Sequence, residues 1–194
     1  MKERPILFSA PMVRALLAGT KTQTRRTCNH PGLKDLSYIV NCGDGWWGDE
    51  EGDFQARCPY GQPGDRLWVR EAFAIVPRTA YRCSEGVQQT LRPDDDHDAA
   101  IYREGWVRSK GGFRWRPSIH MPRWASHITL EVTGVRVERL QDISEADAIS
   151  EGTPFPCGGW VGGYQKLWES IHGPGSWDLN PWVWVVEFKR VMPC

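Results

Sequence analysis

The stretch RPILFSAPMVRALLAGTKTQTRR, residues 4–26, decides how the chain begins to fold. It opens with an apolar run that predicts a short buried strand. Ser9, with a proline shortly after it, is typical of a helix start, where proline is tolerated because no backbone donor is needed. The apolar spacing that follows predicts a helix over residues 10–18, and Gly19 suits the left-handed conformation that ends it. The threonine-rich residues 20–27 then favour a second strand.

This second strand carries four threonines and three cations, and it includes Lys21 and Thr24. One interpretation is a solvated edge strand, in which lysine and arginine discourage pairing between sheet edges. A regular strand directs residues three positions apart to opposite faces. Lys21 and Thr24 can therefore share a site only if the backbone turns or bulges between them.

The pattern Gly19-x-Lys21-x-x-Thr24-x-Arg26 resembles the signature of the ASCH family, whose members are PUA-like β-barrels linked to RNA. One branch of the family consists of small bacterial amidohydrolases that remove the acetyl group from N4-acetylcytidine. Those enzymes are similar in using a lysine and a threonine at this spacing. Much of the wider family has a glutamate at the position of Thr24, so the chain resembles the amidohydrolase branch there. Nearly the whole chain also resembles the longer ASCH proteins of enterobacterial phages and prophages.

The resemblance implies a catalytic set of Lys21, Thr24 and Glu151. The family's glutamate lies near the end of a helix, which here corresponds to the helix predicted over residues 143–151. Amide hydrolysis needs a nucleophile, a base and stabilisation of the oxyanion. Thr24 would supply the hydroxyl, and Lys21 would take its proton as a free amine, which burial would favour. Glu151 would orient Lys21 or the substrate amine.

The predicted substrate-binding residues are Arg26, Trp68, Arg70, Ser118 and Trp124. Trp68 and Arg70 share one face of a strand that follows a Pro-Gly-Asp turn, and we take that face as the wall of the cleft. Packing of Trp68 in the core is the alternative. Ser118 and Trp124 belong to a stretch that is among the closest matches to the prophage ASCH type.

Residues 113–124 interleave three arginines with three aromatic residues. This composition suits single-stranded nucleic acid, because rings stack on bases while guanidinium groups neutralise phosphates. We therefore expect this segment to lie beside Lys21. The expected partner is a modified nucleoside or single-stranded RNA.

The later part of the chain shows a clear series of elements. Residues 128–140 alternate as a strand in which Gly134 predicts a bend or bulge. Ser144 with Asp147 is typical of a capping box at the start of the helix over 143–151. A further helix over 163–171 and a doubly buried strand over 181–188 complete the series.

These elements predict a single α+β domain over residues 1–194. The resemblance implies a PUA-like small β-barrel, closed or nearly closed, with short flanking helices. Turn-rich residues around 30–57 and 77–112 lack periodicity and are interpreted as two insertions. Trp46 and Trp47 in the first would anchor that loop to the body, with base stacking as the alternative. The acidic run at residues 94–98 in the second would be solvated, with metal binding as the alternative.

Composition limits the other classes of protein. Lys+Arg equals Asp+Glu at 24 each, so the net charge argues neither for nor against a polyanionic partner. No apolar run approaches the ~20 residues that span a bilayer, and no signal-peptide core is present, so we expect a cytoplasmic protein with no membrane contact. The six cysteines include no Cys-x-x-Cys pair and are expected to be free thiols. The spacing of Cys28, His30, Cys42 and Cys58 fits no common zinc pattern, so we expect neither a metal nor a cofactor.

Three functions are compatible with these observations. The first is an amidohydrolase that removes an acyl group from a modified pyrimidine nucleoside such as N4-acetylcytidine. The second is a non-catalytic PUA-like module that binds RNA or a modified base. The third is an ASCH-type ribonuclease with Lys21 and Arg26 at the phosphate.

Overall fold

The computed structural model describes residues 1–82, 84–106, 112–153 and 158–191, which form an α+β structure. These residues contain a five-stranded sheet, two three-stranded sheets and four α-helices. The α-helices are α1 (Ala10–Leu17), α2 (Pro31–Lys34), α3 (Glu145–Ser150) and α4 (Gly159–His172). The predicted helices over 10–18, 143–151 and 163–171 thus correspond to α1, α3 and α4.

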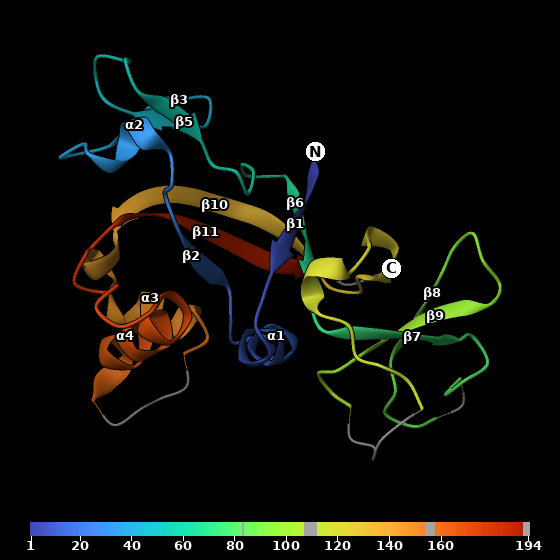
Figure 1. Cartoon of the computed structure of the whole chain (residues 1–194). Helices are drawn as coiled ribbons and strands as arrows, with labels where there is room; N and C mark the ends of the chain where they lie inside the picture. The colour runs from blue at the N-terminus through green and yellow to red at the C-terminus, as the bar shows by residue number, and fades with distance from the viewer. Residues whose placement is uncertain (83, 107–111, 154–157, 192–194) are drawn as a thin grey trace.

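The five-stranded sheet runs in the order β1-β6-β10-β11-β2 and forms the centre of the molecule (Figure 1). Its strands are β1 (Glu3–Leu7), β2 (Gln23–Thr27), β6 (Arg66–Arg70), β10 (Thr129–Arg139) and β11 (Trp182–Val191). β1 pairs with β6 in parallel, and the other pairs are antiparallel. Helices α1, α3 and α4 lie on one side of this sheet (Figure 1).

The barrel that the resemblance implies is not closed within the described residues. β1 and β2 are the two edges of the large sheet, and no backbone ladder joins them. Closure requires these edges to pair at a fixed stagger. A side chain connects them instead, because Arg26 Nη2 on β2 donates to the carbonyl of Leu7 on β1 at 2.6 Å. The large sheet is therefore arched but open (Figure 1).

The two smaller sheets occupy most of the regions interpreted as insertions. The first contains β3 (Val40–Gly43), β4 (Trp46–Gly48) and β5 (Gln55–Arg57), and the second contains β7 (Phe73–Pro77), β8 (Gln89–Leu91) and β9 (Asp98–Tyr102). Residues 30–57 thus contain regular strands, although the sequence there showed turn signals and no periodicity. Asp44 and Gly45 both have positive φ, as a tight hairpin between β3 and β4 requires.

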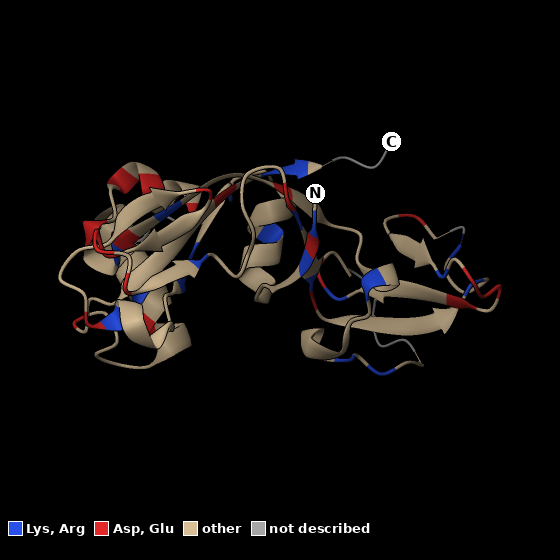
Figure 2. Ribbon diagram, turned by 90° about the horizontal axis from the view of Figure 1, so that it is seen from above, with Lys and Arg blue, Asp and Glu red and all other residues tan. Residues whose placement is uncertain are grey.

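The second small sheet projects from the large sheet on the opposite side of α1 from α3 and α4 (Figure 1). Figure 2 shows basic and acidic residues distributed over both parts of the molecule. The acidic run between β8 and β9 is partly neutralised, because Arg92 lies 3.4 Å from Asp95 and Arg78 pairs with Asp96. The sheet β7-β9-β8 thus forms a separate surface at one end of the molecule.

Local sequence signals account for several of these elements. Gly19 directly follows the C-cap of α1 and has a φ of +74°. The Ser144 hydroxyl accepts from the Asp147 backbone N–H, which completes the predicted capping box of α3. The register of β10 shifts at Gly134, as a bulge requires. Ser9 is the N-cap of α1, but its side chain forms no capping hydrogen bond.

The main core lies between the large sheet and α1. It includes Ile6, Val13, Leu67, Leu130 and Val186, each at most 2% exposed. A second core cluster joins α3 and α4 to the other face of β11, so this strand is buried on both faces as predicted. The two clusters hold β11 from both faces, and β2 pairs with β11 along its edge. The position of β2 is therefore fixed through β11.

Within the described residues, every helix is too short or too polar to cross a bilayer. Cys28, Cys42 and Cys58 are free thiols, and the described residues hold no group of three or more histidine, cysteine or acidic side chains that would bind a metal. Cys83, Cys157 and Cys194 lie outside the described residues.

Replacement of Gly152 by alanine should destabilise the fold more than replacement of Gly19. Both glycines have φ near +74°, so each alanine meets the same backbone cost of about 1 kcal/mol. A Cβ at Gly152 would also lie 2.8 Å from the Ala15 Cβ and 3.0 Å from the Lys21 Cβ, whereas a Cβ at Gly19 meets no atom within 4 Å. Urea unfolding should show a further loss of about 1–3 kcal/mol for Gly152→Ala. Equal losses for the two variants would contradict the close packing of Gly152 on Lys21.

Candidate functional site

A change in backbone hydrogen-bond partners just before β2 sets the position of Lys21. Lys21 forms an isolated bridge with Glu151 at the end of α3, and the Thr22 N–H donates to Ser150 at 2.8 Å. The Thr22 carbonyl accepts instead from Phe188 of β11, and regular pairing with β11 begins at Gln23. This switch from α3 to β11 is the irregularity that Lys21 and Thr24 require to share a site.

The side chains of Lys21 and Glu151 form a buried ion pair. Lys21 Nζ lies 2.8 Å from Glu151 Oε2 and also donates to the Glu151 carbonyl oxygen at 2.8 Å. Both residues are only 3% exposed. The ammonium also lies 5.6 Å from the centre of the Phe8 ring, within the range of a cation–π contact. Residues 130 positions apart in the sequence are thus joined in the interior.

The environment of Lys21 favours loss of its proton. Burial lowers the pKa of Lys21, because removal from water penalises the charged form. Glu151 opposes this effect, whereas the charges of Arg26 and Arg25 add to it, and the net change in the pKa is downward. A lysine in this setting reaches the free-amine form more easily than an exposed lysine.

Thr24 lines the same pocket as Lys21 and Glu151. The pocket has a volume of about 120 Å³ and lies between the edge of the large sheet, α1 and α4. Thr24 is 4% exposed, and its side chain forms no hydrogen bond within the described residues. The structure therefore brings together the three residues of the predicted catalytic set, with the threonine hydroxyl still free to bind or react.

Arg25 connects this pocket to a network of carboxylates. Its guanidinium lies 3.5 Å from Glu151, 3.0 Å from Glu138 and 3.2 Å from Asp147. Arg136 extends the network, with Nη2 at 2.9 Å from Asp147. Glu151 is thus held between two cations, and each of its carboxylate oxygens faces one of them. This arrangement fixes the orientation of the Glu151 side chain.

Arg26 also lines the pocket, as its predicted role in substrate binding requires. Its guanidinium carbon lies 5.3 Å from the centre of the Phe8 ring and 6.0 Å from that of Tyr60. The hydrogen bond to Leu7 holds it at the open edge of the sheet. A positive charge is therefore fixed at one wall of the pocket.

The sequence analysis missed an aromatic wall that α4 contributes. Tyr164, Trp168 and His172 line the pocket at successive four-residue spacings, which places them on one face of the helix. His172 stacks on Trp168 at a centroid distance of 4.1 Å, and burial, together with the charge of Arg26, lowers the pKa of His172. The four-residue spacing was the signal in the sequence that could have revealed this wall.

The other predicted substrate-binding residues lie elsewhere. Trp68, Arg70, Ser118 and Trp124 are not among the residues that line the Lys21 pocket. Arg70 stacks over Trp68 at 5.1 Å and donates to the Met121 carbonyl, while Trp124 packs below Arg92 at 5.8 Å. Residues 112–117 and His120 line a different and larger cavity. The structure does not bring these residues together with Lys21.

Comparison with known proteins adds no relative. No protein-family model, curated protein or solved structure matches the chain significantly. The interpretation of the Lys21 pocket therefore rests on its own geometry and on the motif.

The Asp147 contacts predict a stability change in acid. Burial tends to raise the pKa of Asp147, but the hydrogen bond from Ser144 and the charge of Arg25 outweigh it and lower the pKa from 3.8 to about 2. Because the folded-state pKa is the lower one, the ionised form stabilises the fold above pH 4, and this contribution is lost as the pH falls towards 2. The free energy of unfolding should decrease by at most about 2 kcal/mol across this window.

Chemical unfolding at several pH values checks this prediction. Asp147→Asn should be less stable than the wild type at pH 6, and the two should converge near pH 2. Glu145→Gln is the matched control, because Glu145 is an exposed acid of the same helix. Parallel acid profiles of the wild type and Asp147→Asn would show that the contacts of Asp147 contribute no stability.

Proposed function

We propose that the chain is an amidohydrolase that removes an acyl group from the exocyclic amine of a modified cytidine, such as N4-acetylcytidine. The observation that carries the proposal is the convergence of Lys21, Thr24 and Glu151 in one pocket. Acyl transfer requires a nucleophile and a base to take its proton. The Thr24 hydroxyl would be the nucleophile, and Lys21, with its lowered pKa and its contact to Glu151 at 2.8 Å, would be the positioned base.

In the proposed reaction, Thr24 Oγ1 attacks the acyl carbonyl carbon, and its proton passes to Lys21 Nζ. The carbon–nitrogen bond then breaks, and Lys21 returns the proton to the leaving amine of the cytosine ring. A water molecule hydrolyses the resulting threonine ester and releases the carboxylic acid. Glu151 positions Lys21, and Arg26 places positive charge beside the oxyanion.

The dimensions and walls of the pocket support a small acyl group on a flat ring. A volume of about 120 Å³ takes the acyl group and the edge of a base, while the sugar remains outside. Tyr164 and Trp168 supply aromatic walls for the ring. Leu7 and Ile171 border the pocket and are exposed, so the rim is apolar. Because the sugar stays outside, the substrate can be a free nucleoside or part of an RNA.

The same motif leads us to infer a PUA-like fold of the ASCH type, and we further propose that the protein is cytoplasmic. The arched sheet and the helices that cover one side of it support this inference. The competing function is a module that binds a modified base without chemistry. One observation favours this binding module: Lys21 and Glu151 neutralise each other's charge in the interior, as a pair with a purely structural role would.

Substitutions of Thr24 should separate catalysis from binding. Thr24→Val removes the hydroxyl and keeps the shape, so deacetylation should fall by at least about 10²-fold, whereas Thr24→Ser should keep part of the activity. Thr22→Val is the matched control, because Thr22 is exposed, lies two residues away and does not line the pocket. Release of cytidine, followed by chromatography, measures each variant.

An unchanged rate in Thr24→Val would exclude the threonine as nucleophile. Retention of N4-acetylcytidine by the wild type with no product would favour the binding module, and cleavage of labelled RNA would favour the ribonuclease.

The rate should rise with pH if Lys21 acts as the base. Its free amine is the active form, and its pKa lies below the ordinary value of 10.5, so the inflection of kcat/KM should fall below pH 10.5. Lys21→Ala should lose about 10²–10⁴-fold in kcat/KM together with this inflection. Measurement of kcat/KM from pH 5 to 10 checks the profile, and an inflection that persists in Lys21→Ala would assign it to another group.

A further inference from the structure

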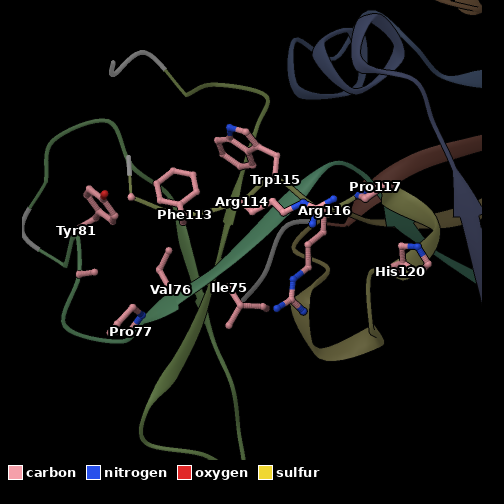
Figure 3. Close-up of a pocket in the computed structure, with 12 residues that line it drawn as sticks. Ile75, Val76, Pro77, Tyr81, Phe113, Arg114, Trp115, Arg116, Pro117 and His120 are labelled. Carbon is pink, nitrogen blue, oxygen red and sulfur yellow. The ribbon is translucent and has the colours of Figure 1, made fainter. Parts of the chain in front are cut away.

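A second cavity lies on the sheet β7-β9-β8, away from the Lys21 pocket. It has a volume of about 920 Å³ and is bordered by β7 and by the extended segment 112–120 (Figure 3). Ile75 and Val76 both line it, from opposite faces of the edge strand β7. The volume falls within the ~300–1,000 Å³ typical of ligand sites. We refer to this cavity as the β7 groove.

Among the described residues, the β7 groove is lined by two arginines, Arg114 and Arg116, and by His120, with no aspartate or glutamate. Both arginines are exposed, and within the described residues neither guanidinium forms an ion pair or a hydrogen bond. The arginines of the neighbouring turn differ, because Arg78 and Arg92 pair with the acids between β8 and β9. The two arginines therefore bring positive charge to the groove with which no described acidic side chain forms an ion pair.

Three aromatic rings line the groove beside these arginines. Phe113 lies between Tyr81 and Trp115 (Figure 3), and it meets them edge to face at centroid distances of 6.1 and 5.0 Å. Trp106 packs on Phe113 and Trp115 at 5.2 and 5.7 Å. Each ring is only partly buried, so apolar ring surface remains accessible. Mutual packing fixes the rings before any ligand arrives, which lowers the entropy cost of binding.

The backbone holds the segment in place on β7. Arg116 and Phe73 form a bridge in which the Arg116 N–H donates to Phe73 at 2.7 Å and the Phe73 N–H donates back at 3.2 Å. Phe73 is fully buried, so the bridge is anchored in the core. The arginines and rings of the segment thus keep a fixed spacing.

We propose that the β7 groove binds single-stranded nucleic acid. Its rings would stack on unpaired bases, and Arg114 and Arg116 would contact the phosphates on either side. An acidic peptide would satisfy the arginines but not the rings, and a duplex keeps its bases stacked inside the helix. This site uses none of the residues of the Lys21 pocket and does not depend on acyl hydrolysis.

Fluorescence anisotropy with labelled oligouridine and oligothymidine of equal length tests the proposal. The wild type should bind at low salt, and the double variant Arg114→Ala/Arg116→Ala should bind at least about tenfold more weakly. Loss of two phosphate contacts should also reduce the slope of log Kobs against log salt by about 1.4, since each contact on a single strand contributes about 0.7. Comparison of the two oligomers shows whether RNA or DNA is preferred.

Arg78→Ala is the matched control, because it removes a paired arginine from the same sheet and should leave the affinity unchanged. Thr24→Val, which keeps the shape of its side chain and lies outside the β7 groove, should bind nucleic acid as the wild type does, so failure of the hydrolase proposal remains distinguishable from failure of this one. Trp115→Ala should weaken binding about tenfold or more, with circular dichroism to confirm that it folds. Absence of wild-type binding, an unchanged affinity in the double variant, or equal displacement by polyglutamate would overturn the proposal.

Discussion

The buried ion pair between Lys21 and Glu151 is the interaction on which the arrangement of this protein depends. It joins the start of β2 to the end of α3, and Arg25 extends it to Glu138 and Asp147. Loss of one partner of such a pair leaves an uncompensated buried charge, which typically costs about 3–5 kcal/mol. The same contact opposes the lowering of the Lys21 pKa by burial, so both the stability and the proposed chemistry involve this one pair.

Local signals in the sequence predicted much of the secondary structure. Gly19 ends α1, Ser144 caps α3 and Gly134 marks the bulge in β10, because each of these features depends on a few adjacent residues. Closure of the sheet was not predictable in this way, since it depends on whether two distant edges meet. The Asp44–Gly45 pair is a turn signal in the sequence, but the glycines and tryptophans around it do not alternate between apolar and polar residues as a strand would.

The candidate site was predictable only in part. The motif placed Lys21, Thr24, Arg26 and Glu151 together, and all four line one pocket. The aromatic wall of α4 required attention to the spacing of Tyr164, Trp168 and His172, whereas Ser118 and Trp124 do not line this pocket. Composition showed that residues 113–124 suit nucleic acid, but it contained no information on which surface presents them. The protein therefore has two separate candidate sites, the small Lys21 pocket and the larger β7 groove.

The central claim is that the Lys21 pocket hydrolyses an amide rather than merely holding a base. The most direct test is incubation of the purified wild-type protein with N4-acetylcytidine, followed by chromatographic quantification of cytidine and acetate. The account predicts that both products appear in equal amounts, with many turnovers per protein molecule. Recovery of unchanged N4-acetylcytidine after prolonged incubation with folded protein would contradict it.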